Sequence, residues 1–103
     1  MIKVKISSNS IHIAGHANYA PIGQDIVCAG VSTVVQSLIQ SIETLTSDTI
    51  KYDMKPGKVH INFEKSLSED AQLLVDSFFI AVEAIAENYP NHVKICPGVE
   101  KRH

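Results

Sequence analysis

Two side chains of this chain could carry out nucleophilic chemistry together: the thiol of Cys28 and the imidazole of His16. A long helical pattern begins near Ile26 and places Cys28 in its first turn. Backbone N–H groups there have no intrahelical partner, and the helix dipole is positive. A cysteine in that position is biased towards the thiolate, which is the nucleophilic form. His16 lies upstream, across a loop of small residues and turn formers that can fold back to the sulfur, so the pair meets the minimum for a cysteine–histidine dyad.

Two motifs around these residues are more specific than their spacing. The runs Gly15-His16-Ala17 and Gly23–Ser32 (GQDIVCAGVS) resemble the ribosomal-processing cysteine protease Prp family of small bacterial proteins, over the whole chain. The resemblance implies that His16, in the GHA motif, and Cys28, in the DIVCA motif, form the catalytic dyad. It implies that the substrate is the N-terminal extension of large-subunit ribosomal protein twenty-seven, with bulky apolar residues before the cut. It also implies a homodimer.

Four neighbouring residues are candidates for binding the substrate or orienting the dyad, namely Tyr19, Gly23, Asp25 and Ser32. Asp25 is a natural N-cap for the helix, and its alternative role is to orient His16. Tyr19 is the only large side chain of segment 18–24, which is either a flap over the site or an ordinary strand-to-helix connection. Gly23 leaves room for a substrate backbone. Ser32 either contacts the site or bonds back to a helix carbonyl.

The length and composition of the chain favour a single globular domain over residues 1–103, the expected protease domain, because 103 residues suit one core and 45% of them are hydrophobic. The net charge is −2 and the pI is about 6.2. Proteins that bind nucleic acid usually show a basic surface, so direct contact with nucleic acid is not expected. The sequence contains no Cys-x-x-Cys pair and no glycine-rich phosphate fingerprint. We therefore expect neither a metal nor a cofactor.

The termini and the cysteines predict a cytoplasmic protein. Charges interrupt the apolar residues of Met1–Lys5, which is unlike a signal peptide. Cys28 and Cys96 are the only cysteines, and without a secretion signal they are expected to be reduced thiols, with Cys96 inert. The helical run from Ile26 carries too many polar side chains for a membrane span, so no membrane partner is expected.

The hydropathy pattern predicts the order β-β-α-β-β-α-β. Strands with alternating apolar residues are expected over 1–7, 11–17, 50–54, 59–64 and 92–96. A helix is expected over 26–45, nearly enclosed as the centre of the domain. A second helix is expected to follow a capping box over Ser66–Glu69 and to end before Pro90. Two hairpins, each followed by a helix, indicate an α+β fold with a mainly antiparallel sheet and two long helices on one face.

The function that these patterns favour is that of a cysteine protease. Cys28 would attack the peptide bond, and His16 would accept its proton and later protonate the leaving amine. N–H groups at the helix start, with or without a loop N–H, would stabilise the oxyanion. Two other classes stay open: a non-catalytic, ribosome-associated peptide-binding module, and a thiol redox protein that uses Cys28 without hydrolysis.

Overall fold

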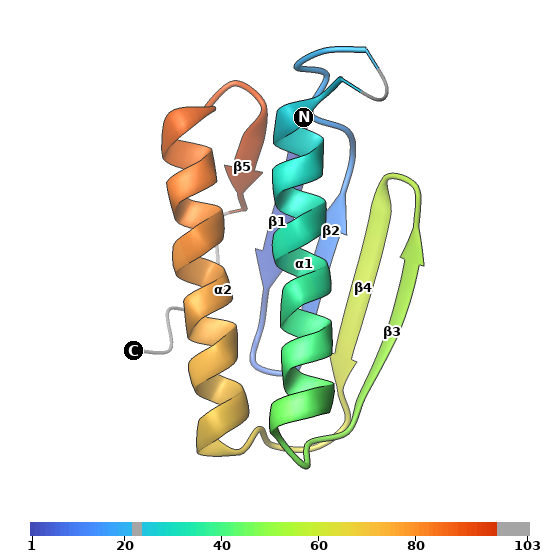
Figure 1. Ribbon diagram of the computed structural model, residues 1–103, viewed down its shortest axis with the longest axis vertical. Helices are drawn as coiled ribbons and strands as arrows, with labels where there is room; N and C mark the ends of the chain where they lie inside the picture. Colours follow the sequence, from blue (N-terminus) through green and yellow to red (C-terminus); the bar gives the residue numbers. More distant parts are fainter. Residues whose placement is uncertain (22–23, 97–103) are drawn as a thin grey trace.

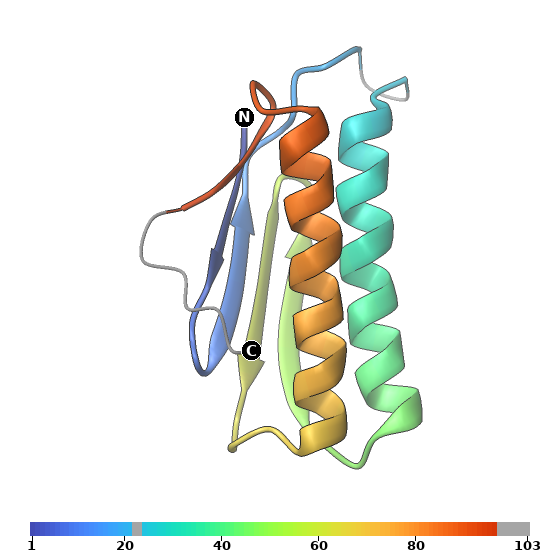
Figure 2. The same ribbon diagram turned by 90° about the vertical axis from the view of Figure 1, so that its left-hand side faces the viewer.

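A computed structural model of the chain, which describes residues 1–21 and 24–96, consists of a five-stranded sheet with two helices on one face (Figures 1 and 2). The predicted element order and the α+β class are confirmed. The elements are β1 (Ile2–Ile6), β2 (Ser10–Ala14), α1 (Ile26–Leu45), β3 (Ile50–Lys55), β4 (Lys58–Phe63), α2 (Glu69–Asn88) and β5 (Val93–Ile95).

The strand order β3-β4-β2-β1-β5 determines which loops meet at the site. Three pairings are antiparallel, and only β5 runs parallel to β1. Because β4 pairs with β2, the turn of the β3–β4 hairpin lies beside the end of β2, where Gly15 and His16 follow. The Gly15 N–H donates to the Gly57 carbonyl at 2.8 Å and ties this turn to that strand end.

One face of the sheet is buried under the helices, and no described helix or strand covers the other face. In β1, Ile2, Val4 and Ile6 are at most 3% exposed, whereas Lys3 and Lys5 between them are exposed. This is the alternation of a half-buried strand, and it confirms the period-two prediction. Both helices lie on the side of the buried residues, as Figure 2 shows edge-on. Neither helix covers edge strand β3, so Tyr52 and Met54 on the helix side remain exposed.

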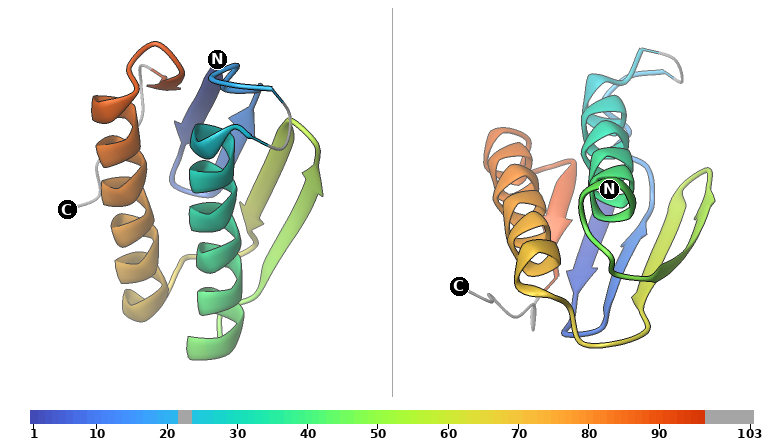
Figure 3. Two further views of the ribbon diagram at one scale, coloured as in Figure 1. Left: turned by 45° about the horizontal axis from the view of Figure 1, so that its top comes forward. Right: turned by 60° about the horizontal axis from the view of Figure 1, so that its bottom comes forward.

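The first helix is not enclosed as the sequence suggested. α1 lies beside α2 in one layer (Figure 3) and buries only one stripe, made up of Val27, Val31, Val35, Leu38, Ile39 and Ile42. Leu45, the last residue of α1, is 67% exposed. By length and apolar composition alone, α1 could cross a membrane. Its buried stripe on the sheet accounts for that composition as the core-facing side of a helix.

The second helix begins with a different cap from the predicted capping box. Ser68 is the N-cap, and its hydroxyl accepts the Ala71 N–H at 3.1 Å. Glu69 and Asp70 lie in the first turn, where their negative charge interacts favourably with the positive end of the helix dipole. The Ser68 N–H donates to Asp48, just after α1, at 2.9 Å. This bond ties the start of α2 to the connection that leaves α1.

Candidate active site

The Gly-His-Ala motif turns the chain out of β2 and presents the histidine. Gly15 has a φ of +103°, and a Cβ there would collide with the Met1 carbonyl oxygen. Only glycine combines that backbone conformation with that space. His16 follows as an exposed side chain, and Ala17 returns to the interior with 1% of its surface exposed. The three residues therefore have separate roles: a turn, a presented imidazole and a buried anchor.

The imidazole of His16 lies against the turn of the β3–β4 hairpin. Gly57 has a φ of +75°, and a Cβ added there would lie 2.6 Å from His16 Nε2 and 3.0 Å from its Cε1. The first distance is shorter than real Cβ contacts and the second is unusually tight, so the ring in this position occupies space that the glycine leaves free. The neighbouring Pro56 fixes the other side of the turn. The hairpin therefore forms the wall that positions His16.

Cys28 lies in the first turn of α1 because Asp25 begins the helix. One carboxylate oxygen of Asp25 accepts the N–H groups of Val27 at 3.0 Å and Cys28 at 2.9 Å. This confirms the predicted N-cap. The other oxygen accepts the N–H groups of Tyr19 at 3.0 Å and Ala20 at 3.4 Å. Asp25 thus joins the loop after His16 to the start of the helix.

These four bonds have electrostatic consequences for the site. The hydrogen bond from the Cys28 N–H, followed by those from Tyr19, Ala20 and Val27, lowers the pKa of Asp25 below its ordinary 3.8, although desolvation acts in the opposite direction. The carboxylate also occupies the N–H groups of Val27 and Cys28, and the Ala29 N–H donates to the Asp25 carbonyl at 3.0 Å. Those three helix-start amides already have partners within the protein, and the expected oxyanion donors stay a prediction.

The sulfur of Cys28 receives a hydrogen bond from the loop instead. The buried Ala17 N–H lies 3.3 Å from Cys28 Sγ. The carbonyl oxygen of Ala17 lies 2.8 Å from Nδ1 of His92, the residue just before β5. A carbonyl only accepts, so Nδ1 carries the proton in this contact. His92 thereby fixes Ala17, whose N–H favours negative charge on the sulfur.

The ring of Tyr19 packs against other aromatic side chains and not into the pocket beside Cys28, where a substrate-binding residue would be expected. It meets Tyr89 and His92 edge-to-face, with ring centroids 5.4 and 5.3 Å apart. Tyr19 does not line the pocket beside Cys28. Its aromatic contacts hold the loop after His16 against the end of α2.

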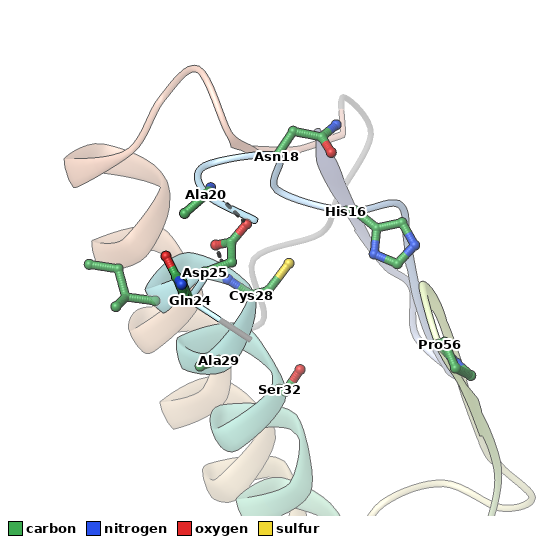
Figure 4. A pocket seen from close by; sticks show the side chains of 10 residues that line it. His16, Asn18, Ala20, Gln24, Asp25, Cys28, Ala29, Ser32 and Pro56 are labelled. Atoms are coloured by element: carbon green, nitrogen blue, oxygen red, sulfur yellow. Dashed lines mark hydrogen bonds between the residues drawn. The ribbon is translucent and has the colours of Figure 1, made fainter. Parts of the chain in front are cut away.

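A cavity of about 600 Å³ brings the two reactive side chains together. Figure 4 shows the Cys28 sulfur directed across this pocket towards the His16 ring, with Ser32 one turn below the sulfur on the same side of α1. Ile26 supplies an apolar wall and is 58% exposed. Gly23, a candidate for substrate approach, lies outside the described residues. The lining consists of His16, Asn18, Ala20, Gln24, Asp25, Ile26, Cys28, Ala29, Ser32 and Pro56.

A second cavity of about 260 Å³ lies next to Cys28 and His16, between α1 and the β3–β4 hairpin. It shares His16, Cys28 and Ser32 with the first. Deeper residues of this cavity are apolar, among them Ile13, Val31, Val35, Met54 and Val59. An apolar space therefore lies directly beside Cys28 and His16.

Metal chemistry has no visible set of ligands at this site. Within residues 1–21 and 24–96, no group of three or more His, Cys, Asp or Glu side chains could hold an ion. Cys96 is half-buried next to β5, where its N–H donates to the Val4 carbonyl at 2.8 Å. It does not line either cavity beside Cys28.

Comparison with known proteins relates this chain to a family of cysteine proteases. Residues 1–94 match the sequence model of a family described as cysteine protease Prp. Proteins named ribosomal processing cysteine protease Prp are similar: that of Staphylococcus aureus is 32% identical, covering 92% of this chain and 97% of the relative. The Bacillus subtilis protein is 30% identical, covering 87% and 86%.

Solved structures share the fold. The S. aureus protease Prp with a covalently linked product peptide has a TM-score of 0.83 and 25% identity, covering 91% of this chain and 94% of that one. A Streptococcus mutans protein has a TM-score of 0.81 and 30% identity, covering 92% and 91%. The fold and the thiol-containing pocket are those of a cysteine protease. The chain belongs to the cysteine protease Prp family, whose members take part in ribosomal protein processing.

The anchoring role of Asp25 predicts a dependence on pH. Because the pKa of Asp25 is lower when folded, its stabilising effect is complete above 3.8 and is lost as the pH falls through the folded-state value. We expect the melting temperature of wild type to fall more steeply below pH 4 than that of Asp25→Ser, which keeps one capping oxygen but does not titrate. The hydrogen bonds of Ser68 also lower the pKa of Asp48. Because Asp48 is present in both proteins, its contribution to the pH dependence cancels in the comparison. Parallel acid-dependence curves would show that the Asp25 bonds contribute nothing.

The contact between His92 and Ala17 predicts the result of a matched pair of substitutions. His92→Phe keeps a ring beside Tyr19 but removes the donor to Ala17 O, and we expect slower alkylation of Cys28 by iodoacetamide. His92→Asn keeps a donor close to the Nδ1 position and should restore most of the rate. Mass spectrometry after timed alkylation measures both variants. A wild-type rate for His92→Phe together with a slow rate for His92→Asn would assign the effect to ring packing alone.

Proposed function

We propose that Cys28 and His16 form the catalytic dyad of this protease. The observation that carries the proposal is the pocket in which thiol and imidazole face one another while a buried amide, that of Ala17, donates to the sulfur. A redox protein or a passive peptide-binding module has no need of an imidazole opposite the thiol. The covalently linked peptide described for the S. aureus relative fits the same chemistry.

The proposed reaction has two steps. His16 accepts the thiol proton, the sulfur attacks the scissile carbonyl, and His16 returns the proton to the leaving amine. A thioester then joins Cys28 to the N-terminal fragment, and water attacks it with His16 as base. The product is a free carboxylate, and the thiol is regenerated. The oxyanion needs N–H donors, and those of Val27, Cys28 and Ala29 already have partners within the protein.

The proposed substrate is the N-terminal extension of large-subunit ribosomal protein twenty-seven. The support is the relatives' description as ribosomal processing proteases and the apolar cavity that lies next to Cys28 and His16. That cavity suits the bulky apolar residues expected before the cut, since burying such side chains adds binding energy at the reacting centre. Ser32 and Ile26 border the peptide on the α1 side.

The assembly of the protein is a separate part of the proposal. We expect a homodimer, because Leu73 and Ile80 lie two turns apart on α2 and are 69% and 59% exposed. Such side chains mark a surface that association would cover. Sedimentation equilibrium of wild type and Leu73→Glu compares the two states, with a monomer expected only for the variant.

The proposal is tested by incubating the purified protein with ribosomal protein twenty-seven that carries its extension. Mass spectrometry of the substrate should show one truncation at a single bond, with unrelated unfolded proteins left intact. A substrate that binds but stays intact would favour the peptide-binding module. Sulfenic acid at Cys28 that depends on a second thiol, without cleavage, would favour the redox protein.

A further inference from the structure

The uncovered face of the sheet is strongly basic, although the whole chain has a net charge of −2. Strand register places the side chains of six lysines on this face. All six are exposed: Lys3, Lys5, Lys51, Lys55, Lys58 and Lys94. Net charge is a poor guide here because the carboxylates of α2, Glu69, Asp70, Asp76, Glu83 and Glu87, belong to the other layer of the molecule.

Like charges face one another in this surface. Lys3 pairs with Lys94 across β1 and β5, and Lys55 pairs with Lys58 across β3 and β4. Lys58 and Lys3 flank Ala14 on β2, so four lysines form one row across five strands. Strands lie about 4.8 Å apart, which makes this row about 19 Å long. Like charges directly opposite in a sheet destabilise it, so nothing in the fold itself accounts for the row.

Few anions among residues 1–21 and 24–96 neutralise the face. Lys51 pairs with Glu64 at 3.0 Å and Lys55 with Asp53 at 3.5 Å. For Lys3, Lys5, Lys58 and Lys94, the described part of the chain provides no salt bridge. These four lysines are therefore available to an external anion. Asp53 is the one carboxylate among the strand residues that point to this face.

The centre of the face is aromatic. His12 on β2 and His60 on β4 are directly opposite one another, with ring centroids 5.4 Å apart at 83°. Lys5 is the neighbour of His12 on β1. Aromatic rings in the middle of an open, lysine-bearing sheet are the arrangement with which proteins bind single-stranded RNA, because bases stack on rings while phosphates meet cations.

We propose that this open face binds single-stranded RNA through its phosphates. A row of cations matches a chain of phosphates, and the family's work on ribosomal proteins brings it to RNA-rich partners. The row lies at the end of the sheet from which His16 emerges, since Ala14 precedes Gly15 and Lys58 follows Gly57. RNA on this face would hold a ribosomal substrate near the pocket without entering it. The inference goes beyond the proposed function and can fail independently of it.

The test measures binding of a fluorescein-labelled single-stranded RNA by anisotropy at several salt concentrations. Four free lysines predict a slope of about −2.8 for the logarithm of affinity against the logarithm of salt, at about −0.7 per phosphate for single strands. The variant Lys3→Gln/Lys94→Gln should halve the slope to about −1.4. At 0.1 M salt the same relation predicts about 25-fold weaker binding.

Two controls separate binding from folding and from catalysis. Lys65→Gln removes an exposed lysine beyond the end of β4 and should leave binding unchanged. The double variant should melt no lower than wild type, because it relieves the repulsion between facing lysines. It should also cut a short peptide of the extension at the wild-type rate, since neither lysine lines the first cavity.

Three outcomes would overturn the proposal. One is binding that Lys65→Gln weakens as much as Lys3→Gln/Lys94→Gln does. Another is polyglutamate competing as well as RNA of equal charge, which would make an acidic protein the occupant. The third is no RNA binding together with a lysine-dependent self-association in sedimentation, which would make α2 of a second copy the occupant.

Discussion

Cys28→Ala is expected to lower turnover of the extended ribosomal protein by at least about 10⁴-fold, because it removes the atom that attacks the carbonyl. His16→Ala should lower turnover by about 10²- to 10⁴-fold, the usual contribution of a general acid and base. Both variants should still bind the substrate, since the apolar cavities remain. Initial rates and anisotropy with a labelled extension peptide measure the two effects.

The chain provides a matched control for the nucleophile. Cys96→Ser removes the other thiol and should leave turnover unchanged, because Cys96 lines neither cavity beside the dyad. If Cys96→Ser were as slow as Cys28→Ala, the assignment of the nucleophile would fail. Turnover that survives Cys28→Ala would lead to the same conclusion.

A substitution in the β3–β4 turn should be nearly as damaging, although Gly57 performs no chemistry. Gly57→Asn adds a Cβ where His16 Nε2 would be 2.6 Å away, so the imidazole must move. Asparagine tolerates a φ of +75° better than most residues, and the melting temperature should change little. We expect turnover to fall by about 10²-fold, as misplacing a catalytic group by about 1 Å can cost that much.

A double-mutant cycle tests whether the effect of Gly57 passes through His16. In the His16→Ala background, Gly57→Asn should have almost no further effect, because the ring that it displaces is already absent. An equal loss in both backgrounds would mean that the turn acts on folding or on substrate binding. Melting curves of all four proteins identify the first of these explanations.

Local signals in the sequence predicted the elements and the start of α1. The alternation in β1 and the apolar spacing in α1 each reflect the repeat geometry of a single element, so periodicity reveals them. Asp25 was predicted as the N-cap because its partners, Val27 and Cys28, are two and three residues away. The placement of Cys28 in the first turn follows from that cap.

The surroundings of the dyad could not be predicted in the same way. His92 is 75 residues from Ala17, and they meet because β5 adds to the sheet beside β1. Gly57 reaches His16 because β4 pairs with β2 on one side as well as with β3, its neighbour in sequence, on the other. A Pro-Gly pair reads from sequence as a turn, and strand order alone reveals which side chain it touches. The Asp25 cap that places Cys28 also accepts the N–H groups of Val27 and Cys28, which the prediction of helix-start oxyanion donors did not take into account.

The location of the lysines on the open face of the sheet also could not be predicted from composition. The net charge of −2 was the reason for not expecting contact with nucleic acid. A net charge does not say where on the surface the charged side chains lie. Register separates Lys3 and Lys94 on the open face from the carboxylates of α2. Charge distribution follows from the fold, and a net value describes it only when both signs are mixed.

The central claim, that Cys28 attacks the carbonyl before the cut with His16 as its base, is tested most directly by covalent capture. A peptide of the extension that ends in an electrophilic vinyl sulfone should add once to the wild-type protein. Peptide mapping by mass spectrometry should place the adduct on Cys28, with Cys96 unmodified and His16→Ala reacting far more slowly. An adduct on Cys96, or a peptide that binds the pocket and leaves Cys28 unmodified, would contradict the account.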